Sequence, residues 1–135
     1  MQVQFQREAV TQAEDGFTVR RLYPWPGRVE SPWGSAWIVI NPGKYSTPHW
    51  HDEEETFLIL SGSGEMIVDG EARAVTKGDV IYLPRCSTHT LKNSHDSEDL
   101  EMLCIWWGGN ERTVNNIVSL EEALSPAVRS AHPPD

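Results

Sequence analysis

The sequence predicts an all-β domain with the architecture of an antiparallel sandwich or barrel. Between Gly16 and Trp107, apolar and polar residues alternate with a period of two, which is typical of strands that bury one face. These stretches are short and closely spaced, and helical periodicity is nearly absent from them. Asp69 and Gly70 predict a tight hairpin turn, because both residues tolerate positive φ angles. The predicted strands span residues 16–23, 36–40, 45–51, 56–60, 64–68, 72–75, 79–83, 88–93 and 100–107.

After the last predicted strand the composition becomes polar, beginning with two glycines and an asparagine at residues 108–110. Ser119 and Glu122 then have the spacing of a capping box, which predicts a short helix over residues 120–124. The expected organisation is a β-barrel over residues 1–108 and a C-terminal tail with a short helix over residues 109–135.

Composition restricts the classes of function. A length of 135 residues is about one domain, and 39% hydrophobic with 23% charged residues is typical of a globular protein. The net charge of −9 argues against a nucleic-acid partner, because phosphate binding needs clustered Lys and Arg. The sequence has neither a signal-peptide pattern nor an apolar run long enough to span a membrane, so we expect a cytoplasmic protein without a membrane partner.

Three histidines and one carboxylate form the pattern that carries chemistry. His49 and His51 lie two residues apart in a predicted strand, so their imidazoles point to one face and can clamp a metal ion. Glu55 follows on the next strand or the turn before it, and His89 lies in a later predicted strand. The alternative is that these are ordinary polar strand residues, but the shared spacing favours a metal site.

Two stretches around these residues resemble the two conserved motifs of the cupin superfamily. Residues 43–62 resemble the first motif at every fixed position, namely Gly43, His49, His51, Glu55 and Gly62. Within the acidic run of residues 52–55, only Glu55 has the six-residue distance to Gly62. Residues 78–93 resemble the second motif at Gly78, Pro84, His89 and Asn93, but Cys86 stands where glycine is usual. That replacement puts the geometry of the local turn in doubt.

The resemblance implies a single cupin barrel, that is, a double-stranded β-helix or jelly roll. It also implies a homodimer and assigns metal ligation to His49, His51, Glu55 and His89. Imidazoles and a carboxylate are borderline ligands, so we expect one divalent transition metal per chain. Zinc or iron is favoured, and manganese, nickel or copper is admissible. Four protein ligands leave room for a substrate if the ion becomes five- or six-coordinate.

Several other residues are candidates for a substrate cavity. Some share a predicted strand face with the ligands or lie together on one face of the last strand, where core packing is the alternative role. Cys86 is either a small packing residue or a reactive thiol. Arg21 could hold a carboxylate through paired hydrogen bonds or form a surface salt bridge. The candidates are Tyr45, Thr47, Cys86, Met102, Cys104, Trp106 and Arg21.

The first functional hypothesis is a metal-dependent cupin enzyme that acts on a small polar metabolite. Residues 21–25 and 105–107 are similar to stretches in the zinc-binding cupin domains of hydrazine synthetases. That similarity implies an amino-acid-derived substrate, a rearrangement that forms an N–N bond, and a partner enzyme in a biosynthetic pathway. The alternatives are an iron-dependent dioxygenase and a non-catalytic module that binds a small molecule.

Overall fold

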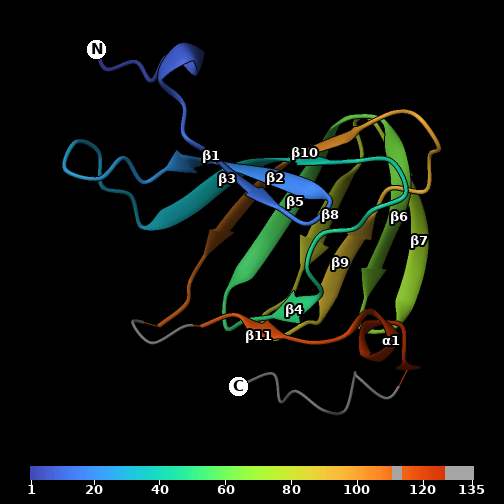
Figure 1. Ribbon diagram of the computed structural model, residues 1–135. Coiled ribbons are helices and arrows are strands. Elements are labelled where there is room, and N and C mark those ends of the chain that lie inside the picture. The colour runs from blue at the N-terminus through green and yellow to red at the C-terminus, as the bar shows by residue number, and fades with distance from the viewer. Residues whose placement is uncertain (111–113, 127–135) are drawn as a thin grey trace.

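The computed structural model describes residues 1–110 and 114–126. Two antiparallel sheets pack face to face, and each contains strands that are distant in sequence (Figure 1). The six-stranded sheet has the order β1 (Thr11–Glu14), β2 (Phe17–Tyr23), β3 (Trp33–Ile40), β10 (Leu100–Trp107), β5 (Glu54–Ser61), β8 (Val80–Leu83). The five-stranded sheet has the order β11 (Asn116–Ile117), β4 (His49–Trp50), β9 (His89–Lys92), β6 (Ser63–Val68), β7 (Glu71–Thr76).

The predicted all-β jelly roll is confirmed, although the two sheets do not close into one hydrogen-bonded barrel. Within the described residues, β7 and β8 are the outer strands of their sheets and each pairs with one neighbour only. The core lies between the sheets because one face of each strand is apolar. In β5, for example, Phe57 and Ile59 are buried while their sequence neighbours are partly exposed. Each such side chain contributes about 1.5–3 kcal/mol through burial.

The predicted hairpin at Asp69 and Gly70 is confirmed. The two residues have φ angles of 49° and 78° and connect β6 to β7, with Val68 paired to Glu71. Gly62 makes the preceding turn between β5 and β6, where a Cβ atom would lie 2.6 Å from the carbonyl oxygen of Asp99. A larger residue at this motif position would therefore collide with the backbone.

The stretch from Tyr45 to His51 differs from its prediction, because it is not one continuous strand. Only His49 and Trp50 form β4, and Tyr45 makes an isolated bridge to Lys92. Pro48 has no N–H to donate to a ladder, so the pairing is interrupted before β4. As a result, the alternation of faces does not extend from His49 back to Tyr45.

Some elements have no sequence signal. The prediction misses β1, whose residues are all exposed and show no alternation, and the short β11. It also misses η1 (Gln6–Glu8) and begins β3 three residues late. The missed strand residues are held by pairing with neighbouring strands rather than by a local apolar pattern. In η1, the backbone N–H of Glu8 donates to the carbonyl oxygen of Phe5 at 2.9 Å.

Residues 114–126 of the C-terminal tail run along one end of the two sheets, where β11 pairs with β4 (Figure 1). The predicted short helix is present as α1 (Leu120–Ala123), and the hydroxyl of Ser119 accepts a hydrogen bond from the backbone N–H of Glu122 at 3.1 Å. Of the expected tail over residues 109–135, residues 111–113 and 127–135 lie outside the described part. No helix within the described residues has the length and apolarity needed to cross a membrane.

Candidate metal centre

Three strands and both sheets contribute to a cluster of three histidines and one glutamate. His49 on β4 is the direct cross-strand partner of His89 on β9, and His51 follows β4 by one residue. His49 and His89 belong to the five-stranded sheet, and His51 lies in the loop that follows β4. Glu55 lies on β5 of the other sheet, and its side chain is buried in the interior between the sheets. The structure thus brings the four predicted ligands together.

The four side chains face a common point. One potential ligand atom from each of the three imidazoles lies within 4.8 Å of the other two, and the ring centroids are 4.5–5.2 Å apart. Glu55 Oε1 lies 3.4 Å from His89 Nε2, and Glu55 Oε2 lies 3.6 Å from His51 Nε2. This arrangement of donors could hold one metal ion.

Backbone carbonyls select the tautomers of two of these imidazoles. His49 Nδ1 donates to the carbonyl oxygen of Thr47 at 2.7 Å, and His89 Nδ1 donates to that of Ser87 at 2.9 Å. Because a carbonyl can only accept, each Nδ1 carries the proton, and Nε2 of the neutral ring keeps its lone pair. His89 Nε2 is buried and has no hydrogen-bond partner within the described residues. A buried nitrogen lone pair without a partner fits a bound divalent transition metal.

The electrostatics of the cluster favour a cation. Burial lowers the pKa of His49 to about 4, and the neighbouring His89 contributes to this. Burial also lowers the pKa of His51, but Glu55 and Glu53 together outweigh burial, and the pKa of His51 is raised overall. For Glu55, burial raises the pKa, but the imidazoles of His51 and His89 outweigh it and hold the pKa at about 2. Glu55 is therefore ionised at neutral pH, and the uncharged imidazole of His49 has a lone pair to offer.

A cavity of about 520 Å³ adjoins the cluster, and His49, His51 and Glu55 form part of its wall. Five of the predicted cavity residues line it, and they come from β2, β10 and the loop before β4. They are Arg21, Thr47, Met102, Cys104 and Trp106. The volume lies within the usual range of about 300–1,000 Å³ for small-molecule sites.

Tyr45 and Cys86 are not among the residues that line this cavity, contrary to the prediction. The side chain of Tyr45 is 36% exposed, because the strand alternation that was to place it beside His49 is interrupted. Sequence reasoning also missed Phe57 and Glu53 as lining residues. Phe57 could have been found, since it lies two residues after Glu55 on the same face of β5.

Cys86 lies in a turn and is not part of the cavity wall. Its φ angle of 63° lies in the left-handed region, so the cysteine adopts the conformation that glycine usually provides at this motif position. Its backbone N–H donates to the carbonyl oxygen of His51 at 2.8 Å. The neighbouring Arg85 donates to Asp52 at 2.8 Å. The turn therefore holds the backbone at His51 in spite of the departure from the motif.

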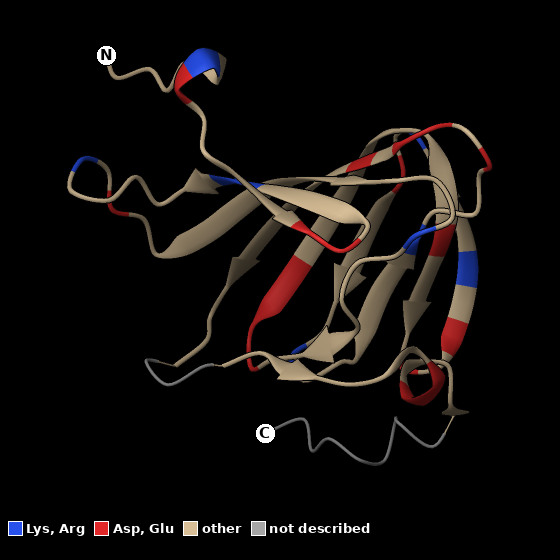
Figure 2. Ribbon diagram, viewed as in Figure 1, with Lys and Arg blue, Asp and Glu red and all other residues tan. Residues whose placement is uncertain are grey.

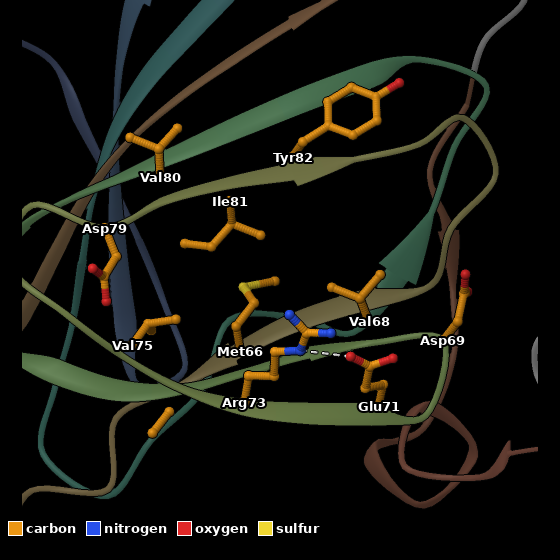
Figure 3. Close-up of a pocket in the computed structure, with 11 residues that line it drawn as sticks. Met66, Val68, Asp69, Glu71, Arg73, Val75, Asp79, Val80, Ile81 and Tyr82 are labelled. Atoms are coloured by element: carbon orange, nitrogen blue, oxygen red, sulfur yellow. Dashed lines mark hydrogen bonds and ion pairs between the residues drawn. The ribbon is translucent and has the colours of Figure 1, made fainter.

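A second pocket, of about 540 Å³, lies between β6, β7 and β8 (Figure 3). Its floor is apolar and includes Met66, Val68 and Ile81. Arg73 lies at its rim and pairs with Glu71 at 2.6 Å, so its charge is already balanced. The residues described around this pocket include no histidine. The cavity beside the histidines is therefore the better candidate for chemistry.

Comparisons with known proteins agree with the fold and the site. The chain belongs to the cupin family, since the Cupin domain (Cupin_2) model matches residues 36–106, just over half of its length. A solved structure of a Cupin 2 conserved barrel domain protein from Salinispora arenicola is 33% identical, with a TM-score of 0.68. That match covers 80% of this chain and 89% of the other.

Curated relatives match shorter segments. Uncharacterized protein MJ1618 of Methanocaldococcus jannaschii is 36% identical over 67 residues, which are 49% of this chain and 53% of that protein. The 5-nitrosalicylic acid 1,2-dioxygenase of a Bradyrhizobium species is 31% identical over 62 residues, 46% of this chain and 30% of the enzyme. The chain thus spans about half or less of the length of these relatives. None of these three proteins has a name that mentions a hydrazine synthetase.

Proposed function

We propose that the chain is a metal-dependent cupin enzyme that acts on a small polar metabolite. The observation that carries this proposal is the convergence of His49, His51 and His89 with Glu55 at the wall of a cavity of about 520 Å³. The orphaned Nε2 of His89 supports it, because a buried imidazole nitrogen without a partner is costly unless something binds it.

In this proposal the three histidines and Glu55 hold one divalent transition metal, with zinc or iron favoured. A bound metal of this kind would supply Lewis acidity or, in the case of iron, oxygen activation. Thr47 and Ser87 fix the histidine tautomers through their carbonyl oxygens. Apolar side chains such as Phe57 and Met102 would exclude water around the metabolite. We also propose a cytoplasmic location.

An iron-dependent dioxygenase is the second candidate, and the named dioxygenase relative favours it. The N–N bond-forming rearrangement of an amino-acid-derived substrate, with its partner enzyme, has no support from the relatives described above. A non-catalytic binding module is the remaining alternative, because the fold alone does not imply a reaction. The content of metal in the purified protein separates these candidates.

The test is elemental analysis of protein purified without added metal, followed by measurement of oxygen uptake. We expect about one zinc or iron per chain from the single site. Iron with substrate-dependent oxygen uptake would favour the dioxygenase, and zinc without oxygen uptake would favour rearrangement or hydrolysis. Protein that neither contains nor takes up a metal would contradict the enzyme proposal and favour the binding module.

A matched pair of variants tests the site itself. The double variant His49→Ala/His51→Ala removes two of the four donors, and we expect tight metal uptake to be lost. His95→Ala is the control, because His95 lies in an exposed loop and does not belong to the cluster. If the double variant takes up as much tightly bound metal as His95→Ala, the proposed centre is wrong.

A further inference from the structure

Arg21 is a cation at the wall of a cavity that Glu14, Glu53 and Glu55 also line. It lies on β2, lines the cavity of the histidine cluster, and pairs across the sheet with Ala36. Within residues 1–110 and 114–126, its guanidinium has no ion pair or hydrogen bond, and its recorded contact is with the ring of Trp106. The chain has 20 acidic and 11 basic residues, and acidic residues occupy many loops and strand ends (Figure 2). The buried Nε of Arg20 also lacks a hydrogen-bond partner within the described residues, but Arg20 does not line the cavity and Arg21 does.

The ring of Trp106 supports the guanidinium of Arg21. The Arg21 Cζ atom lies 5.4 Å from the ring centroid, which is within the distance of a cation–π contact. Trp106 pairs across the sheet with Gly34, and a Cβ atom at Gly34 would overlap the indole. The glycine therefore lets the ring lie directly against the β3 backbone. Stacking on a ring leaves the N–H groups at the edge of a guanidinium available to an anion.

Small side chains follow Arg21 across the six-stranded sheet. The cross-strand register runs from Arg21 to Ala36 on β3, and from there to Cys104 on β10. Both Ala36 and Cys104 are small, and both line the cavity. Cys104 Sγ donates to the carbonyl oxygen of Ala36 at 3.5 Å, so the thiol is engaged within the wall. The space between Arg21 and the metal ligands is thus open to a small molecule with an apolar middle.

We infer that Arg21 is the substrate-binding residue that selects small carboxylates, and this inference rests on the proposed metal-dependent function. The guanidinium binds the carboxylate of the substrate, and a second oxygen of the same molecule faces the histidine–glutamate cluster. The planar fork of an arginine matches a carboxylate through two parallel hydrogen bonds. A neutral metabolite would leave the guanidinium without its anion and is therefore disfavoured.

The test uses full-length protein loaded with Co²⁺, whose visible spectrum reports ligands at the metal. Succinate and glutarate serve as carboxylate probes of two lengths, and azide serves as a small anion that needs only the metal. Arg21→Gln is compared with Arg20→Gln, which removes the same charge one residue away. Arg20 faces the other side of β2, because it pairs with the outward Trp37. Arg21→Lys keeps the positive charge but loses the planar guanidinium that can form two parallel hydrogen bonds.

Arg21→Gln is expected to lower the affinity for the tighter-binding dicarboxylate by on the order of tenfold to a hundredfold, because the charged hydrogen bonds of the guanidinium are lost. Arg21→Lys should lie between it and the parent protein. Arg20→Gln should bind the dicarboxylate like the parent, and azide affinity should be the same in all variants. Circular dichroism verifies the fold, and Arg21→Lys provides the comparison if Arg21→Gln does not fold.

Two outcomes would overturn the inference while leaving the metal centre intact. In the first, the protein binds azide, but replacing Arg21 does not change its affinity for the dicarboxylate. The other is an equal loss in Arg20→Gln and Arg21→Gln, which would indicate a general charge effect. Failure of the parent protein to take up Co²⁺, or to show an azide-dependent spectrum, would instead overturn the proposed function and the inference with it.

Discussion

His89 Nδ1 donates a hydrogen bond to the carbonyl oxygen of Ser87 at 2.9 Å, two residues earlier in the chain. This contact determines which nitrogen of a 2% exposed imidazole carries the proton. The other nitrogen faces Glu55 Oε1 at 3.4 Å and makes no hydrogen bond within the described residues. The local backbone therefore prepares His89 as a ligand, because a hydrogen bond from one ring nitrogen leaves the lone pair of the other nitrogen directed at the metal position.

Replacing His89 by Ala should remove most of the thermal stabilisation that zinc provides. A metal that binds only the folded state, at 1,000 times its Kd, stabilises by about 4 kcal/mol. We expect zinc to raise the Tm of the parent protein by several degrees, and to have little effect on the Tm of His89→Ala. Differential scanning fluorimetry with and without zinc measures both shifts. An undiminished zinc shift in His89→Ala would count against its role as a ligand.

Glu55→Gln should weaken zinc affinity by about tenfold or more, because it replaces an ionised oxygen ligand by a neutral amide. Glu54→Gln is the matched control. Glu54 faces the other side of β5, where it accepts hydrogen bonds from Tyr82 and Trp107. Competition with a chromophoric chelator measures the affinity of each variant. Equal losses in the two variants would indicate a general charge effect rather than ligation by Glu55.

Cys86→Gly should maintain or increase stability, by up to about 1 kcal/mol, because a non-glycine residue with a positive φ angle is strained. Cys86→Val should destabilise the protein, since a β-branched residue fits the φ angle of 63° less well. Urea denaturation followed by tryptophan fluorescence gives the free energy of unfolding of each variant. If Cys86→Gly were clearly less stable than the parent, the contacts of the Cys86 side chain would stabilise the protein by more than the strain of its positive φ angle destabilises it.

The two cysteines should differ in reactivity. Burial, together with the nearby charge of Glu55, raises the pKa of the Cys104 thiol, which is 3% exposed. It should therefore stay protonated and unmodified by iodoacetamide at about pH 8, since the thiolate is the nucleophile. Cys86 is half-buried and should react faster. Peptide mass spectrometry before and after unfolding in urea tests this, and rapid labelling of Cys104 in the folded protein would contradict it.

The homodimer implied by the family remains a prediction, for which the outer face of the six-stranded sheet offers a surface. Trp33 and Trp37 of β3 lie on this face and are each 38% exposed. Ile105 and Trp107 of β10 lie beside Trp33. Ile105→Glu should convert dimers to monomers, because it places a charge in an apolar interface. Light scattering during size-exclusion chromatography measures the mass. Val10→Glu, at an 85% exposed position outside the sheets, should leave the mass of the assembly unchanged.

The sequence alone determined the features that depend on short spacings. A period of two predicted the strands, Asp69 and Gly70 predicted the hairpin, and Ser119 predicted the start of α1. The spacing of His49 and His51 placed two imidazoles together, since the backbone repeats every two residues in a strand. The wider motif, through the resemblance it carried, also selected Glu55 and His89, which the structure brings to the same point.

Only the tertiary structure decided which of the other polar residues share the cavity. Both Arg21 and Arg85 are cations in an acidic chain, but Arg85 pairs with Asp52 in a turn, whereas Arg21 lines the cavity and forms no ion pair with any described residue. Tyr45 was misplaced because Pro48 interrupts a strand that the alternation suggested was continuous. Periodicity specifies the face of a side chain within its own strand. Its partners depend on which strands pair and how the two sheets pack, and contacts between residues distant in sequence decide both.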